Sequence, residues 1–181
     1  MNRVLGEATA VEQSTLKELI DHILAVHHMY LRRELPLIEQ RINEVRELEA
    51  DSLRGLAGVF AGLKAELEMH MRKEEMILFP HIVRAEQSVQ AGRPWAPPPF
   101  GSFGNPIQVM EHEHDSAIHA LDEMRRLTNG YRLPEDADDN RRVLYAGLEG
   151  LERDLRVHIH LENDILFPRS MAMEPVSSQE S

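Results

Sequence analysis

The chain is long enough for one compact domain with a substantial core, and its composition excludes several classes of protein. It has 181 residues and a formal net charge of -11, so it lacks the basic surface that nucleic acids and acidic membranes attract. It has no apolar run of about 20 residues, as a membrane span requires, and we expect no secretory leader and a cytoplasmic location. Because the chain contains no cysteine, any metal must be bound by nitrogen and oxygen ligands.

Residues 1–13 show no periodicity and are expected to form a flexible N-terminal arm. Ser14 is a candidate N-cap for a first long helix. The apolar stripe of this helix places His28 on the buried face and its neighbour His27 outside it. Pro36 is predicted to bend the helix without breaking it, since the stripe continues in phase beyond it. The apolar members of the stripe are Ile20, Leu24, Leu31, Leu35, Ile38, Ile42 and Val45.

A second helix is predicted from about residue 53 to residue 79, ending at Pro80 or one turn beyond it. Its buried stripe contains a histidine and a glutamate where apolar residues are expected. The stripe consists of Leu56, Leu63, Leu67, His70, Glu74 and Ile77. Residues 87–106 are rich in proline and glycine, which predicts a long crossover loop.

The third helix is predicted to begin near Ile107, and its stripe places His114 in the core. Residues 129–139 contain the signals of a turn, and a fourth helix is predicted from about residue 140 to residue 167. Its stripe consists of Leu144, Leu148, Leu151, Leu155, His158, Glu162 and Ile165. We expect the domain to span residues 14–169 and residues 170–181 to form a disordered tail.

Four long amphipathic helices joined by two short turns and one crossover predict an all-α fold, an antiparallel up-down four-helix bundle. In an antiparallel hairpin, residues equidistant from the turn meet at the same height. His28 and His70 flank the first turn in this way, and His114 and His158 flank the second. Stacking the two hairpins therefore gathers the four core histidines and the two core glutamates at one level.

One segment occurs twice, as HMRKEEMILFP over residues 70–80 and as HIHLENDILFP over residues 158–168. Both copies have a histidine and, four residues on, a glutamate that shares its helix face. Burying both groups twice is costly without a partner, and a metal ion satisfies both. We therefore predict a non-haem di-iron site in which Glu74 and Glu162 bridge the ions, with manganese or zinc as possible substitutes. The predicted metal ligands are His28, His70, Glu74, His114, His158 and Glu162.

The remaining histidines are interpreted as surface or rim residues, and they are His22, His27, His81, His112, His119 and His160. Two interpretations of Glu113 remain open, an outer hydrogen-bond acceptor for a ligand histidine or a solvated acid. Phe79 and Phe167 are predicted to close the end of the bundle. The crossover loop, with Trp95, Phe100 and Phe103, is open between a lid over the site and a passive spacer.

The residues used above resemble the hemerythrin, or HHE cation-binding, family. The segments LIDHILAVHH, HMRKEEMILFP, MEHEHD and HIHLENDILFPR are most similar to its iron-centre-repair branch. This resemblance implies repair of iron–sulfur clusters after nitrosative and oxidative stress. Many of those proteins also carry an N-terminal domain with a cysteine motif, which this chain does not contain. Oxygen-carrying hemerythrins use a His-x-x-x-His pair on the third helix and an aspartate on the last, where this chain has Met110 or Ile118 and Glu162.

Three functions remain open at this stage. The first is a stress protein that donates iron or handles nitric oxide, with iron–sulfur proteins as partners. The second is a reversible binder of oxygen or nitric oxide, and the third is a peroxide or nitric oxide reductase. Each iron has about six coordination positions. The six ligands and an oxo or hydroxo bridge leave one of these positions open on each iron. We therefore favour a reactive and exchangeable centre over an oxygen store.

Overall fold

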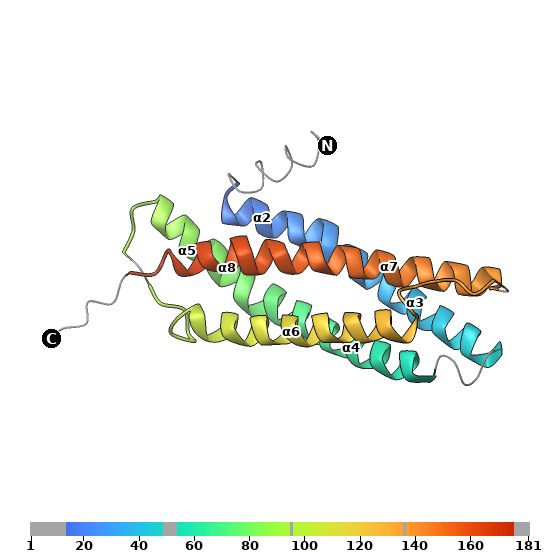
Figure 1. The fold of residues 1–181 in the computed structure, drawn as a ribbon. Coiled ribbons are helices and arrows are strands. Elements are labelled where there is room, and N and C mark those ends of the chain that lie inside the picture. Colours follow the sequence, from blue (N-terminus) through green and yellow to red (C-terminus); the bar gives the residue numbers. More distant parts are fainter. Residues whose placement is uncertain (1–13, 49–53, 95, 136, 176–181) are drawn as a thin grey trace.

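The structure is a computed structural model that describes residues 14–48, 54–94, 96–135 and 137–175. These residues form four helical rods in an antiparallel bundle, and a crossover joins the second rod to the third at one end (Figure 1). Within them there is no strand, so the predicted all-α bundle is confirmed. The rods are, in chain order, α2 (Leu16–Ile23) with η1 (Leu24–His28) and α3 (Met29–Leu48), α4 (Arg54–Lys73) with η2 (Glu74–Leu78) and α5 (Phe79–Gln90), α6 (Gly104–Leu127), and α7 (Asp139–His160) with η3 (Leu161–Leu166) and α8 (Phe167–Met171).

Three of the four rods contain a short π-helical turn, labelled η1, η2 and η3. In η2 the Phe79 N–H donates to the carbonyl of Glu74, five residues back, where an α-helix would reach back four. A π turn holds more residues than an α turn, so it shifts the buried face along the sequence. Accordingly Leu78 is 1% exposed and Ile77 is 47% exposed, and the prediction that Ile77 continues the buried stripe is wrong.

The second rod continues well past Pro80, so the predicted end of this helix is also wrong. The helix runs on as α5 to Gln90, and the crossover begins only after that residue. A proline inside an α-helix collides with the carbonyl four residues before it and removes one backbone donor. We attribute its tolerance here to the wider π turn that precedes it, which relaxes this contact. The fourth rod repeats the arrangement, with Pro168 two residues after the end of η3. In the first rod, α3 continues through Pro36 without a break.

The first rod begins one residue later than predicted, with Thr15 and not Ser14 as its N-cap. The Thr15 hydroxyl accepts a hydrogen bond from the Glu18 N–H (3.1 Å), and the Glu18 carboxylate accepts one from the Thr15 N–H (2.8 Å). This reciprocal capping box requires an acid three residues after the cap, and Thr15 has that spacing to Glu18. Glu86 of α5 adds a second cap, because it accepts hydrogen bonds from the N–H groups of Leu16 (2.6 Å) and Lys17 (3.0 Å).

Replacing Glu86 by alanine should lower the free energy of unfolding of the metal-free protein by about 1–3 kcal/mol, because two amides at the start of α2 lose their acceptor. Glu86 is buried, so neighbouring side chains hinder water from replacing it fully. Urea unfolding followed by circular dichroism measures the change. Glu66→Ala, on the exposed face of α4, is the matched control. Equal unfolding midpoints for the two variants would contradict the capping role of Glu86.

Two apolar clusters fill the bundle and lie on either side of the level of the predicted metal ligands. The larger cluster runs along α3, α4, α6 and α7 toward the two turns. The smaller one lies at the crossover end and contains Phe79, Phe103 and Phe167. Among the described helices none is both long and apolar enough to cross a lipid bilayer.

The predicted boundaries of the domain are only partly covered by the described residues. Helix α8 ends at Met171, and the Glu174 carboxylate accepts a hydrogen bond from the Phe103 N–H (2.5 Å). Ordered contacts therefore extend past residue 169. The predicted arm, residues 1–13, and the end of the predicted tail, residues 176–181, lie outside the described residues.

Candidate metal centre

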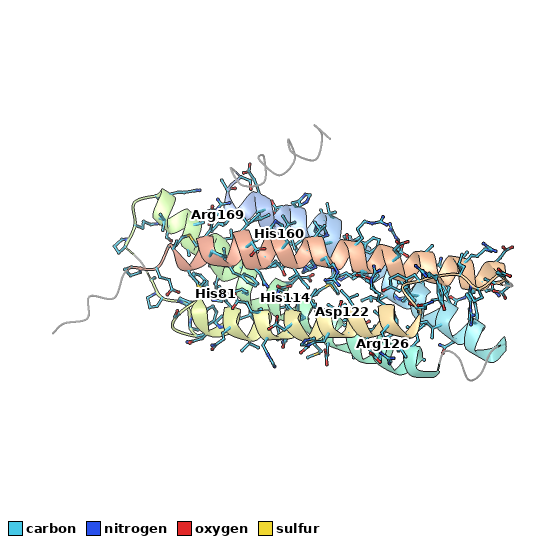
Figure 2. All side chains as sticks on the ribbon, viewed as in Figure 1. His81, His114, Asp122, Arg126, His160 and Arg169 are labelled. Atoms are coloured by element: carbon cyan, nitrogen blue, oxygen red, sulfur yellow. The ribbon has the colours of Figure 1, made fainter. Side chains whose placement is uncertain are left out.

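The structure brings the six predicted ligands together inside the bundle. Each of them is at most 3% exposed. They come from all four rods, and three of them, His28, Glu74 and Glu162, belong to the π turns. His114 points from α6 toward the interior, between the α6 and α7 ribbons (Figure 2). The six side chains therefore lie close together, as the hairpin spacing predicts, and their role as metal ligands stays a prediction.

The six residues form two groups that share both carboxylates. Within each group the ligand atoms all lie within 4.8 Å of one another. One group contains His28 and His158, the other contains His70 and His114, and Glu74 and Glu162 belong to both. Such an arrangement has room for two cations side by side, with the two carboxylates between them.

Each carboxylate directs one oxygen to each group. Glu74 Oε2 lies 3.3 Å from His28 Nε2, and Glu74 Oε1 lies 3.2 Å from His70 Nε2. Glu162 Oε1 lies 3.0 Å from His158 Nε2, and Glu162 Oε2 lies 3.1 Å from His114 Nε2. All four imidazoles therefore present Nε2 to the centre, and both carboxylates have the orientation of a bridge.

The histidines pair across the two hairpins. His70 Nε2 and His114 Nε2 are 3.0 Å apart, and the rings of His28 and His158 are in edge contact with centroids 5.0 Å apart. The cause is the packing of the bundle, in which α4 packs on α6 and α3 packs on α7. Equal distance from the turns explains the common height of the histidines. It does not determine which two histidines share a group.

The donor atoms at the centre fit a cation better than they fit one another. His28 Nε2, both Glu74 oxygens and Glu162 Oε2 are buried without a hydrogen-bond partner among the described residues. Unsatisfied buried polar atoms are rare in proteins because each one costs free energy. Two imidazole nitrogens and two carboxylate oxygens, as each group provides, are a donor set that first-row metal ions accept.

The electrostatics of the metal-free protein also favour positive charge at the centre. Burial lowers the pKa of His70, but the carboxylates of Glu74 and Glu162 and the hydrogen bond to Glu113 outweigh it and raise the pKa to about 9. For Glu162, burial raises the pKa, but His158 and His114 outweigh it and hold the pKa well below its usual range. Without a metal, a proton on His70 supplies positive charge beside the carboxylates.

Three of the four histidines hydrogen-bond an outer side chain through Nδ1. Such a bond fixes the tautomer, so that the Nε2 lone pair faces the centre. The three contacts are His28 Nδ1 to Glu75 Oε1 (2.7 Å), His70 Nδ1 to Glu113 Oε2 (2.9 Å) and His114 Nδ1 to Asn163 Oδ1 (2.7 Å). Of the two readings of Glu113 that the sequence left open, the outer acceptor is therefore confirmed.

Two of the outer acceptors are themselves held by cations. Arg32 donates to both oxygens of Glu75 at 2.6 and 2.5 Å, and Lys73 donates to Glu113. Sequence reasoning missed Glu75 and Asn163, although a signal was present. Each directly follows a core glutamate at the same position of the repeated segment.

The prediction that His27 lies at the surface is wrong. His27 is 4% exposed, its Nδ1 lies 3.0 Å from Asp154 Oδ1, and its ring is stacked on that of His158 with centroids 5.3 Å apart. The extra residue of η1 is the cause, since it turns two consecutive histidines inward. The other histidines of the set follow the prediction, with His81 partly buried and the rest exposed, namely His22, His112, His119 and His160.

Aromatic rings close the centre toward the crossover end. The Phe79 ring lies 5.9 Å from the His28 ring, and the Phe167 ring lies parallel to the His114 ring at 6.0 Å. Both phenylalanines are at most 2% exposed, which confirms their predicted role as core plugs. Phe103 is fully buried in the same apolar cluster, and Trp95 lies outside the described residues. The lid function of the crossover stays a prediction.

This fold and this site define a class of protein, the four-helix bundle with a cation-binding centre of histidines and carboxylates from all four rods. The profile of the hemerythrin HHE cation binding domain matches residues 19–170, and the chain belongs to this family. The chain is also 37% identical to "Iron-sulfur cluster repair protein YtfE" of Pectobacterium atrosepticum over 172 residues, which cover 93% of the chain and 72% of that relative. The Yersinia pestis (strain Pestoides F) protein of the same name is 37% identical over 166 residues, with 90% and 69% covered.

Proposed function

We propose that this protein is a cytoplasmic non-haem di-iron protein whose centre serves the repair of iron–sulfur clusters under nitrosative or oxidative stress. One iron would be bound by His28 and His158 and the other by His70 and His114. Glu74 and Glu162 would bridge them. The observation that carries the proposal is that each of these two carboxylates directs one oxygen to each histidine pair.

The donor set supports iron over the other common metals. Imidazole with carboxylate suits iron, manganese and zinc, whereas magnesium and calcium prefer oxygen ligands alone. Iron bound here, with an oxo or hydroxo bridge, would supply one-electron chemistry and an exchangeable position on each ion. The chain contributes orientation, because Glu75, Glu113 and Asn163 hold three imidazoles with Nε2 inward.

The choice of cluster repair rests on the relatives and on the ligands. Relatives that share 37% of their aligned residues with this chain are named for iron–sulfur cluster repair. The chain has no cysteine, so no thiolate would bind the iron, and carboxylates and neutral imidazoles release iron more readily than a thiolate cage. We propose iron–sulfur proteins as protein partners and nitric oxide, peroxide and oxygen as small-molecule partners.

Iron transfer tests this function. The iron-loaded protein is reduced and mixed without oxygen with an iron-depleted cluster protein, sulfide and a thiol reductant. Iron should move to the acceptor and its cluster absorption should return, and the Glu74→Ala variant given the same total iron is the control. If the acceptor recovers no faster than with the control, the repair role is wrong.

A second candidate is reversible binding of oxygen or nitric oxide, favoured by the closure of the site. All six candidate ligands are at most 3% exposed and two phenylalanine rings lie beside them. A buried enclosure with aromatic rings beside it admits small neutral gases and slows the loss of metal. Exposing the reduced protein to air separates the candidates, because a gas carrier would bind oxygen reversibly for many cycles and transfer no iron.

A further inference from the structure

The fourth histidine of the centre differs from the other three in its outer contacts. His158 Nδ1 is buried and has no hydrogen-bond partner among the residues that the structure describes. Its Nε2 is engaged with Glu162 at 3.0 Å. When Nε2 binds a metal, Nδ1 carries the proton, so a buried N–H donor is left without an acceptor.

An acceptor with a free oxygen lies one helical turn before His158. Asp154 precedes it by four residues on α7, so the two side chains share a face of the helix. Asp154 Oδ1 is bonded to His27 Nδ1 at 3.0 Å. Asp154 Oδ2 is buried and, within the described part of the chain, has no hydrogen-bond partner. A donor and an acceptor are thus both buried and unsatisfied on neighbouring turns.

His27 holds this carboxylate beside His158. The His27 ring is stacked on the His158 ring, with an interplanar angle of 7° and centroids 5.3 Å apart. Because His27 also bonds Asp154, the aspartate is tied to a ring that lies parallel to the ligand. If Asp154 served only as the hydrogen-bond partner of His27, this would account for its Oδ1 atom alone. Its buried Oδ2 atom and the His158 N–H would then remain without a hydrogen bond.

We propose that Asp154, held by His27, is the positioning residue for His158 and accepts its Nδ1–H directly or through one water molecule. This inference rests on the metal centre proposed above and deepens it. Asp154 would do for His158 what Glu75, Glu113 and Asn163 do for the other three histidines. The tautomer with a free Nε2 lone pair would then be fixed in all four.

The proposal predicts an asymmetry between the two metal positions. Asp154 supports a ligand of the group that contains His28 and His158, and within the described residues it makes no hydrogen bond to a ligand of the other group. Loss of such an outer partner typically weakens metal binding by about 10–100-fold. Replacing Asp154 should therefore loosen one ion per chain and leave the second nearly unchanged.

The test is the release of metal to a chelator from zinc-loaded wild type, Asp154→Ala and Asp154→Asn. The matched control is Asp164→Ala, since Asp164 bonds His160, a histidine four residues away, on the exposed surface (2.5 Å). Asp154→Ala should release one ion per chain about 10–100-fold faster than the control and the other at the control rate. Asp154→Asn keeps one acceptor oxygen and nearly the same shape, so it should fold as wild type and release this ion at an intermediate rate.

A second readout separates positioning from general loosening of the fold. In cobalt-loaded protein the Nδ1 protons of histidine ligands give shifted NMR signals, and only that of His158 should exchange faster with solvent in the Asp154 variants. Equal release rates and unchanged proton exchange in both Asp154 variants would overturn the positioning role while the metal centre stands. Equal acceleration of both ions would overturn it too, since a structural defect would suffice. Wild type that binds no metal would overturn the centre itself and this inference with it.

Discussion

Replacing Glu74 and Glu162 together by alanine should abolish binding of both metal ions. Each carboxylate directs one oxygen to each histidine pair, so the double change removes two of the four protein ligands from each position. Two imidazoles alone hold a divalent ion weakly, because the negative charge that attracts it is gone. Metal analysis after loading and desalting should find two ions per chain in wild type and none in the double variant.

Single substitutions of the two glutamates, and of exposed histidines as controls, test the same ligand assignment. Glu74→Ala and Glu162→Ala should each weaken both ions, because each removes one oxygen from both groups. His22→Ala and His119→Ala should keep both ions, since these histidines are exposed. Circular dichroism checks that every variant remains helical. A folded double variant that still binds two ions would show that the six-residue assignment is wrong.

The affinity for metal should rise steeply with pH. In the metal-free protein the pKa of His70 is raised to about 9, so this imidazole is protonated at pH 7 and must lose its proton before Nε2 can bind a metal. Removing this proton becomes up to about tenfold easier with each pH unit. The affinity for metal should therefore rise by up to about a hundredfold from pH 7 to pH 9. The pKa of His28 is also raised, against the effect of burial, by Glu74 and Glu75, and it acts in the same direction.

Competition with a chelator of known affinity for zinc measures this dependence. Isothermal titration in two buffers of different ionisation enthalpy gives the number of protons released, which should be at least one per chain at pH 7. The stability of the metal-free protein should show the opposite trend. The contribution of His70 to the free energy of unfolding is fully present below pH 6.5, the pKa of this histidine in the unfolded chain. It is lost as the pH rises through about 9, its pKa in the folded protein. An affinity that is flat from pH 7 to pH 9 would contradict the protonated state of His70.

The inward position of the six predicted ligands was predictable because each one interrupts an apolar stripe of period 3.6. His70, His158 and their glutamates lie where leucines recur before them, and the repeated segment marks both pairs at once. The common height then follows from chain lengths around two short turns. The bundle was predictable for the same reason, since amphipathic helices of similar length have few other ways to bury their stripes.

Three of the errors, those at His27, Ile77 and Pro80, share one physical origin, the π turns, whose extra residue does not show in a pattern of period 3.6. In η1 the extra residue turns His27 inward beside His28. In η2 it exposes Ile77, and it precedes a proline through which the helix continues. Because α5 was not predicted, its Glu86 could not be recognised as the second cap of α2.

The outer acceptors required knowledge of which helices pack together. Glu75 and Glu113 reach histidines on neighbouring rods, and Asn163 of η3 bonds His114 of α6. Sequence spacing relates residues on one helix, whereas these contacts depend on the rotation of two helices about their axes. The pairing of His28 with His158 and of His70 with His114 was beyond prediction for the same reason.

Anomalous diffraction from crystals of the iron-loaded protein would show directly whether the centre binds two iron ions. Data collected on both sides of the iron absorption edge place each ion without reference to the protein. We expect two peaks per chain, one between His28 and His158 and the other between His70 and His114, with Glu74 and Glu162 in contact with both. A single peak per chain, or two peaks on other residues, would contradict this expectation.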